Sequence, residues 1–146
     1  MQSKILLVDD REDNLFSMET ILEGAGYTFV KANSGKEALK ILLREFDFAL
    51  ILMDVKMPSM DGFETARLIY EREKLRSIPI VFITAQSLDE EHIFRGYHVG
   101  AVDYISKPIN SGLLRAKVAV FVDLYQKTHN LKIQEQKLVP ELLSLG

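Results

Sequence analysis

Short apolar segments alternate with longer amphipathic segments along most of the chain. The apolar segments span residues 5–8, 27–32, 48–53, 80–83 and 101–105, and each is followed by a polar residue. Short apolar runs bounded in this way are typical of strands that are covered on both faces of a sheet. We therefore predict five short strands.

Between these segments the apolar residues recur with helical spacing, as at Leu15, Met18 and Leu22. Ser34 with Glu37, and Ser87 with Glu90, have the spacing of a capping box, which favours a helix start. The predicted helices run from Asp13 to Ala25, from Ser34 through Phe46, from Asp61 through Tyr70, from Ser87 to Gly100, and from about Ser111 toward Leu138.

Five strands that alternate with five helices predict an α/β fold. Strands separated by helices pair in parallel through right-handed crossovers, and the helices then cover both faces of the sheet. We expect a doubly wound parallel sheet. In such sheets, ligands bind beyond the carboxyl ends of the strands.

Polar residues follow four of the predicted strands, namely Asp9 and Asp10, Asp54, Thr84 and Lys107. Because the carboxyl ends of parallel strands meet at one edge, we expect these side chains to converge. Three carboxylates raise one another's proton affinity unless a cation lies between them. Oxygen ligands favour a hard cation, and Mg²⁺ fits best because it accepts fewer protein ligands than Ca²⁺.

Asp54 is the candidate nucleophile, since a run of six apolar residues delivers it to a loop marked by Pro58 and Gly62. A carboxylate attacks phosphorus when the charge on the transferred oxygens is offset. The Lys107 ammonium and the Thr84 hydroxyl are suited to bind two of those oxygens. The pattern predicts that Asp54 accepts a phosphoryl group.

Composition narrows the classes of function. The 146 residues include 47% hydrophobic residues, enough for one domain with a continuous core, and the net charge of −3 argues against direct nucleic-acid binding. The chain has no cysteine, which excludes disulfides and thiolate chemistry and fits the cytoplasm. We find no apolar run long enough for a signal peptide or a membrane span, so no membrane association is expected.

Taken together, these residues resemble the response-regulator receiver domains of two-component signalling over roughly residues 4 to 125. The resemblance rests on Asp9-Asp10, on Asp54 within Leu52-Met53-Asp54-Val55-Lys56-Met57-Pro58, on Thr84-Ala85, and on Tyr104-Ile105-Ser106-Lys107-Pro108. It implies a flavodoxin-like sheet with strand order 2-1-3-4-5. It also implies that Asp54 takes its phosphoryl group from a phosphohistidine on a histidine kinase or phosphotransfer protein.

The resemblance assigns roles to individual residues as well. It implies that Asp10, Asp54 and the backbone carbonyl of Lys56 bind Mg²⁺ directly, and that Asp9 acts through water. A receiver of this kind catalyses only its own phosphorylation and dephosphorylation, so we do not expect a turnover enzyme.

The same resemblance implies a conformational switch formed by Thr84 and Tyr104. The aromatic ring would turn inward when the hydroxyl moves toward the phosphate, which remodels the surface of the fourth helix, fifth strand and fifth helix. It also implies a cis peptide bond between Lys107 and Pro108.

Two alternatives use similar chemistry or the same sheet order. A flavodoxin-like protein that binds FMN needs a phosphate loop after the first strand, where this chain has the acidic run Asp9-Asp10-Arg11-Glu12-Asp13. A phosphatase with an aspartyl intermediate needs a second acid two residues after the nucleophile, where this chain has Lys56. Flavin colour or steady turnover of a phosphomonoester would favour these alternatives.

We divide the chain into a receiver domain, residues 1–125, and a C-terminal helical extension, residues 126–146. Leucines recur every seven residues at Leu124, Leu131, Leu138 and Leu145, but the intervening positions are mixed and Pro140 interrupts the pattern. The extension is either a helix that ends near Leu138 and packs on its own domain or half of a two-chain coil that forms a homodimer. The chain is either a stand-alone receiver or, as we favour, one truncated before an output domain.

Overall fold

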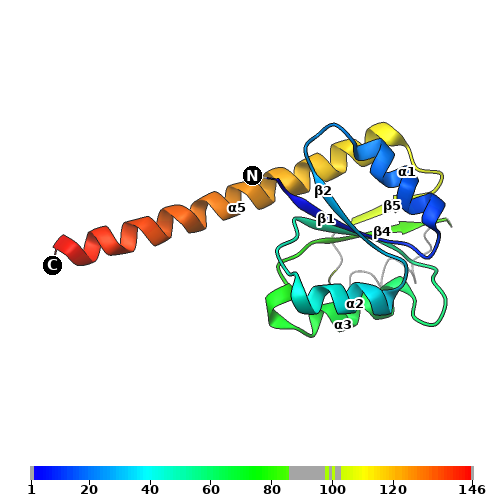
Figure 1. Cartoon of the computed structure of the whole chain (residues 1–146), viewed down its shortest axis with the longest axis horizontal. Helices are drawn as coiled ribbons and strands as arrows, with labels where there is room; N and C mark the ends of the chain where they lie inside the picture. Colours follow the sequence, from blue (N-terminus) through cyan, green and yellow to red (C-terminus); the bar gives the residue numbers. More distant parts are fainter. Residues whose placement is uncertain (1, 86–97, 99, 101–102, 146) are drawn as a thin grey trace.

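The computed structural model describes residues 2–85, 98, 100 and 103–145, which form a parallel sheet between two layers of helices (Figure 1). Its elements are β1 (Lys4–Val8), α1 (Glu12–Leu22), β2 (Thr28–Ala32), α2 (Gly35–Arg44), β3 (Leu50–Asp54), α3 (Gly62–Tyr70), the 3-10 helix η1 (Glu73–Leu75), β4 (Ile80–Thr84), β5 (Asp103–Ser106) and α5 (Ser111–Leu145).

The five strands pair in parallel in the order β2-β1-β3-β4-β5, which confirms the expected fold class. The register sets Val8 beside Met53, Asp54 beside Ile83, and Thr84 beside Ser106. The carboxyl ends of β1, β3, β4 and β5 are therefore aligned. The residues that follow these strands are delivered to one edge of the sheet.

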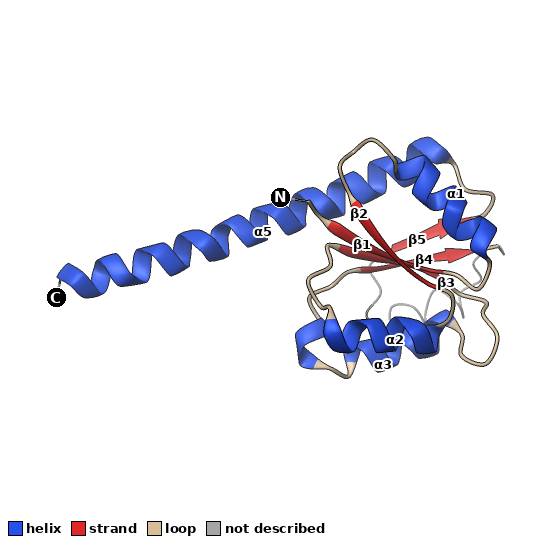
Figure 2. Cartoon of the chain, viewed as in Figure 1, coloured by secondary structure: helices blue, strands red, loops and turns tan. Residues whose placement is uncertain are grey.

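Among the described helices, α1 and α5 lie on one face of the sheet and α2 and α3 lie on the other (Figure 2). Successive residues of a strand point to opposite faces, so Leu6 packs toward α2 and α3 while Leu7 packs toward α1 and α5. Every residue of β3 and β4 is buried. Burial on both faces explains why these strands are almost continuously apolar in the sequence.

Two predicted helix starts are confirmed by their caps. The Ser34 hydroxyl accepts a hydrogen bond from the Glu37 N–H at 3.0 Å, and Asp61 Oδ1 accepts one from the Glu64 N–H at 2.8 Å. The predicted extent of the second helix is wrong, because α2 ends at Arg44 and Phe46 lies in the loop that follows.

The first helix also ends earlier than predicted, at Leu22 rather than Ala25. Gly24 and Gly26 follow it with positive φ angles of 91° and 83°, which turn the chain out of the helical path.

The helix predicted from Ser87 to Gly100 lies outside the described residues except for His98 and Gly100, and Ala101 and Val102 of the predicted fifth strand also lie outside them. Gly100, at the end of that segment, has a φ of 98°. Among the helices that the structure describes, we find none that is long and apolar enough to cross a membrane.

The last helix extends far beyond the sheet (Figure 1). Its first half packs on the domain through Leu114, Val118 and Val122, which are buried. The predicted end near Leu138 is wrong, since α5 continues through Pro140 to Leu145. A proline removes one helical hydrogen bond and crowds the preceding turn, so residue spacing alone does not predict that the helix continues past Pro140.

Candidate functional site

Asp54 ends β3 with its carboxylate at the carboxyl edge of the sheet, and the residue is only 7% exposed. The loop that follows is fixed by two backbone hydrogen bonds, from the Val55 N–H to the Ile83 carbonyl at 3.1 Å and from the Gly62 N–H to the Val55 carbonyl at 2.8 Å. A Cβ atom on Gly62 would lie 2.3 Å from the Asp54 carbonyl oxygen. Only glycine allows α3 to begin this close to Asp54.

The carboxylates of Asp9, Asp10 and Asp54 converge, as the sequence predicted. One oxygen of each lies within 4.8 Å of the others. Asp9 is 1% exposed, and its Oδ1 accepts hydrogen bonds from the Arg11 N–H at 3.0 Å and from Asn14 Nδ2 at 3.3 Å. These two donors fix the orientation of the Asp9 carboxylate. Asp10 is exposed and borders the solvent.

Asn14 was not among the site residues predicted from the sequence, although its side chain contacts Asp9. It lies five residues after Asp9, within the first turn of α1. A side chain in the first turn of a helix can face back toward the end of the preceding strand. The polar character of Asn14 at this position is therefore the sequence feature that could have indicated a contact with Asp9.

Lys107 brings a positive charge to the carboxylates. Its Nζ lies 3.3 Å from Asp54 Oδ1 and 3.5 Å from Asp9 Oδ2. The Lys107 N–H donates to the Thr84 carbonyl at 2.7 Å, which ties the ends of β4 and β5 together. The Lys107–Pro108 peptide bond is cis, as expected.

The pKa of Asp54 is raised to about 6, first because burial disfavours the charged carboxylate and second because the Asp9 charge repels it. The Lys107 ammonium opposes both effects. Asp54 is therefore a poorly solvated carboxylate whose charge is only partly neutralised. Such a group is stabilised by an additional cation.

The donor set fits a hard divalent ion. Three carboxylates offer oxygen ligands, and the exposure of Asp10 leaves room for water on one side. Mg²⁺ uses a few protein oxygens and retains several waters. Asp10 and Asp54 would therefore hold the metal directly and Asp9 would hold it through water, and the Lys56 carbonyl remains a predicted further ligand.

The two residues of the predicted switch lie at neighbouring strands. Thr84 ends β4 and is 7% exposed, while Tyr104 is half-buried in β5. The Tyr104 ring packs against Phe82, with ring centroids 5.7 Å apart, and Phe82 contacts Phe63 of α3 at 4.7 Å. Tyr104 thus connects to the core on the α3 side of the sheet.

A cavity of ≈ 720 Å³ opens beside Asp10 and is also lined by Ser34, Lys36, Pro58 and Met60. It gives solvent access to the acidic cluster from the side of the β3–α3 loop. Within that loop, Ser59 has a φ of 69°, a left-handed conformation that costs free energy for a residue other than glycine. The Met60 N–H donates a hydrogen bond to the Pro58 carbonyl at 2.7 Å, which closes the turn around Ser59.

The family model for the response regulator receiver domain matches residues 5–119. The chain belongs to this family. The matched range includes the acidic pair, Asp54, Thr84 and Lys107, so the convergent residues of the sheet edge lie within the receiver.

Related proteins agree with this assignment. The polar-differentiation response regulator DivK of Brucella ovis is 38% identical over 112 residues, which is 75% of this chain and 88% of DivK. The structure of the chemotaxis protein CheY4 of Vibrio cholerae aligns with a TM-score of 0.77 and 30% identity, over 83% of this chain and 99% of CheY4.

A longer relative matches nearly the whole chain. A probable cyclic di-GMP phosphodiesterase of Vibrio cholerae is 36% identical over 143 residues, which is 97% of this chain. This chain spans only 32% of that relative's length. The similarity therefore includes the extended part of α5 as well as the receiver.

Proposed function

We propose that this receiver domain takes a phosphoryl group onto Asp54 from a phosphohistidine of a histidine kinase or phosphotransfer protein. The observation that carries the proposal is the convergence of Asp54 with two further carboxylates and one ammonium group. Of these three acidic residues, Asp54 is the one that is itself the last residue of a buried strand. The strand therefore holds the nucleophile in a fixed position.

In the proposed reaction, one oxygen of the Asp54 carboxylate attacks phosphorus and forms an acyl phosphate bond. The bond between phosphorus and the imidazole nitrogen of the donor breaks, and that nitrogen retains the electron pair and takes up a proton. The Lys107 ammonium is close enough to Asp54 to bind a phosphoryl oxygen. The Thr84 hydroxyl is proposed to bind another.

Asp10 and Asp54 would hold Mg²⁺ directly and Asp9 through water, with the Lys56 carbonyl as the proposed backbone ligand. A bound Mg²⁺ supplies positive charge that offsets the phosphoryl oxygens in the transition state. The Asp9 carboxylate, fixed by Asn14, keeps the acidic cluster in position. The chain's own groups therefore provide both the metal site and the nucleophile.

The proposed response to phosphorylation begins at Thr84. If its hydroxyl moves toward the phosphoryl oxygens, space opens for the Tyr104 ring, which already contacts Phe82. A turn of that ring alters the surface around β5 and α5. In this proposal the chain acts as a signalling switch that modifies only itself, and it operates in the cytoplasm.

The structure gives less support to the two alternatives. An FMN phosphate would meet the carboxylates of Asp9 and Asp10 where it needs hydrogen-bond donors. A phosphatase needs a general acid beside the nucleophile, and the position two residues after Asp54 is Lys56. Phosphoryl transfer to Asp54 accounts for the same residues and requires no catalytic group that the site lacks.

We also propose that α5 forms a homodimer and connects the receiver, residues 1–125, to an output domain in a longer protein. Val120, Leu124 and Leu131 are 65%, 59% and 60% exposed. Their spacing of four and seven residues places them on one side of the helix. The longer relative matches 97% of this chain, which spans only 32% of that relative, and this supports a place in a longer protein.

Labelling by a small phosphodonor in the presence of Mg²⁺ tests the proposed function, with Asp54→Asn as the matched variant. One labile phosphoryl group on the wild-type chain is the expected result.

A further inference from the structure

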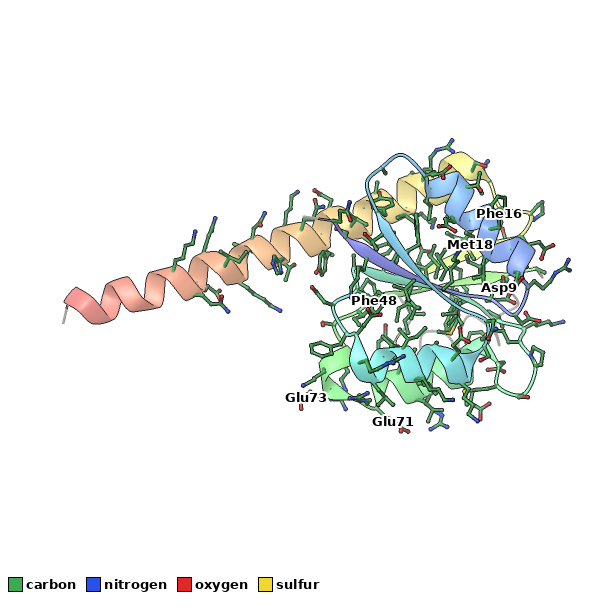
Figure 3. All side chains as sticks on the ribbon, viewed as in Figure 1. Asp9, Phe16, Met18, Phe48, Glu71 and Glu73 are labelled. Carbon is green, nitrogen blue, oxygen red and sulfur yellow. The ribbon has the colours of Figure 1, made fainter. Side chains whose placement is uncertain are left out.

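A second cavity lies at the edge of the sheet opposite to Asp54. It has a volume of ≈ 500 Å³ and lies between α5, the loop from α2 to β3, and the segment from η1 to β4. Asp9 and Phe48 mark the two opposite edges of the sheet in Figure 3, and Phe48 belongs to this cavity. The cavity is therefore separate from the phosphoacceptor site.

This cavity, which we call the groove, has walls that are mainly aromatic and aliphatic. Phe46 and Leu124 face solvent with 50% and 59% exposure, whereas Phe48 at the base is 2% exposed. Phe121 and Tyr125 of α5 form the half-buried opposite wall. The volume and the apolar lining match those of sites for small molecules.

Positive side chains lie among these aromatic groups. Lys74 Nζ is 5.0 Å from the centroid of the Phe46 ring, and Lys132 extends from the next turns of α5. The His129 ring stacks on Tyr125 with centroids 6.0 Å apart and an angle of 20° between the rings. The groove thus combines flat aromatic surfaces with two exposed ammonium groups.

The acidic residue among the described lining residues is Asp47, and it already has a partner. Its carboxylate accepts a hydrogen bond from the Tyr125 hydroxyl. Burial and the nearby Asp47 carboxylate raise the pKa of Tyr125 to about 12, so the hydroxyl remains a donor at neutral pH. The lining is positive overall, although the whole chain has a net charge of −3.

We propose that this groove binds a small planar aromatic anion. The aromatic part packs against Phe46 and Phe121, and the anionic group is attracted by Lys74 and Lys132. Charge complementarity and the aromatic walls select this class over a neutral apolar molecule. The site is independent of phosphoryl transfer at Asp54.

The first experiment titrates the full 146-residue chain with 8-anilino-1-naphthalenesulfonate, an aromatic anion whose fluorescence rises in apolar surroundings. N-phenyl-1-naphthylamine, which has the same rings without the sulfonate, is the uncharged control. We expect saturable binding of the anion with one site and about tenfold weaker binding of the neutral probe. Equal affinity for both probes, or no saturable binding of the anion, would overturn the proposal.

Variants then locate the site. Phe46→Ala and the double variant Lys74→Met, Lys132→Met should each raise the Kd of the anion about tenfold. Phe16→Ala removes an aromatic side chain that is 68% exposed on α1, and Lys127→Met removes an α5 lysine that pairs with Asp123 outside the groove. Both controls should leave the Kd unchanged, and equal losses in controls and groove variants would contradict the assignment.

Amide chemical shifts of the wild-type chain provide a test that needs no variant. Binding of the sulfonate should shift the amides of Ala49 and Ile78, which line the groove. Shifts confined to α1 or to the loop after β3 would place the ligand elsewhere and refute the proposal. Thermal melting of each variant separates a lost site from a lost fold.

Discussion

Lys107 Nζ lies 3.3 Å from Asp54 Oδ1 and 3.5 Å from Asp9 Oδ2, so one ammonium group contacts two of the three clustered carboxylates. The lysine is tied to β4 through its own N–H and the Thr84 carbonyl. Its position therefore depends on the sheet rather than on a free loop. The Lys107 ammonium partly neutralises the Asp54 carboxylate through this contact.

Replacement of Lys107 by methionine keeps an unbranched side chain of similar length and removes the charge. We expect the rate of phosphoryl transfer from a small phosphodonor to fall about 10- to 100-fold, the effect of losing one charge-assisted hydrogen bond. Lys117→Met, which removes a half-buried lysine that pairs with Asp103 rather than with the acidic cluster, is the control. Initial rates of phosphoprotein formation measure both, and equal rates for Lys107→Met and wild type would show that Lys107 does not contact the transferred group.

The raised pKa of Asp54 predicts a more stable Asp54→Asn variant when metal is removed with EDTA. Between pH 4 and pH 6 the folded protein binds more protons at Asp54 than the unfolded chain, so this carboxyl lowers stability as pH rises. Above pH 6 the variant should be more stable by about 2 to 3 kcal/mol. Below pH 4 the difference should vanish.

Denaturant unfolding at pH 7.5 and pH 3.5 measures this effect. Asp13→Asn is the control, because Asp13 lies on the surface and pairs with Arg11. A variant at Asp54 that is less stable than wild type at pH 7.5 without metal would contradict the account of its environment.

Mg²⁺ should stabilise the wild-type chain, because ion binding relieves the repulsion among the three carboxylates. We expect the thermal midpoint to rise with MgCl₂ concentration in wild type and in Asp13→Asn. The rise should be largely lost in Asp10→Asn, which removes an exposed carboxylate and leaves the hydrogen bonds of the buried Asp9 in place. An undiminished response of Asp10→Asn to MgCl₂ would exclude it as a ligand.

The proposed dimer depends on one side of α5. Leu131→Asp places a charge on the exposed apolar side, whereas Ile133, two residues on, lies on the opposite side of the helix and is 38% exposed. Sedimentation should show a dimer for wild type and Ile133→Asp and a monomer for Leu131→Asp. If wild type is itself a monomer at high concentration, α5 does not join two copies of this chain.

The positions of Asp9, Asp54 and Thr84 could be predicted from sequence because each lies at the end of a strongly apolar strand, and parallel strands align their ends. Lys107 follows β5, which contains Asp103 and Ser106 and is less apolar, so its apolar pattern is a weaker signal. The contact of Gly62 with the Asp54 carbonyl could not be predicted, since it depends on how closely α3 begins to β3.

The helix ends were also harder to predict, because they too depend on contacts between elements. Phe46 continues the helical spacing of α2, but it lies in the loop after that helix. Its ring contacts Lys74 of η1 there. Pro140 is a usual stop signal, yet α5 continues past it. At both positions, where the helix ends depends on tertiary contacts and on local conformational energies. The spacing of apolar residues does not encode either of them.

The measurement that tests the central claim most directly is the mass of the intact chain after incubation with acetyl phosphate and Mg²⁺. We predict the addition of one phosphoryl group to wild type and to Asp13→Asn, its loss on treatment with hydroxylamine, and no addition to Asp54→Asn. Equal labelling of Asp54→Asn, or a wild-type chain that takes no phosphoryl group from acetyl phosphate or phosphoramidate, would contradict the assignment of Asp54 as the acceptor.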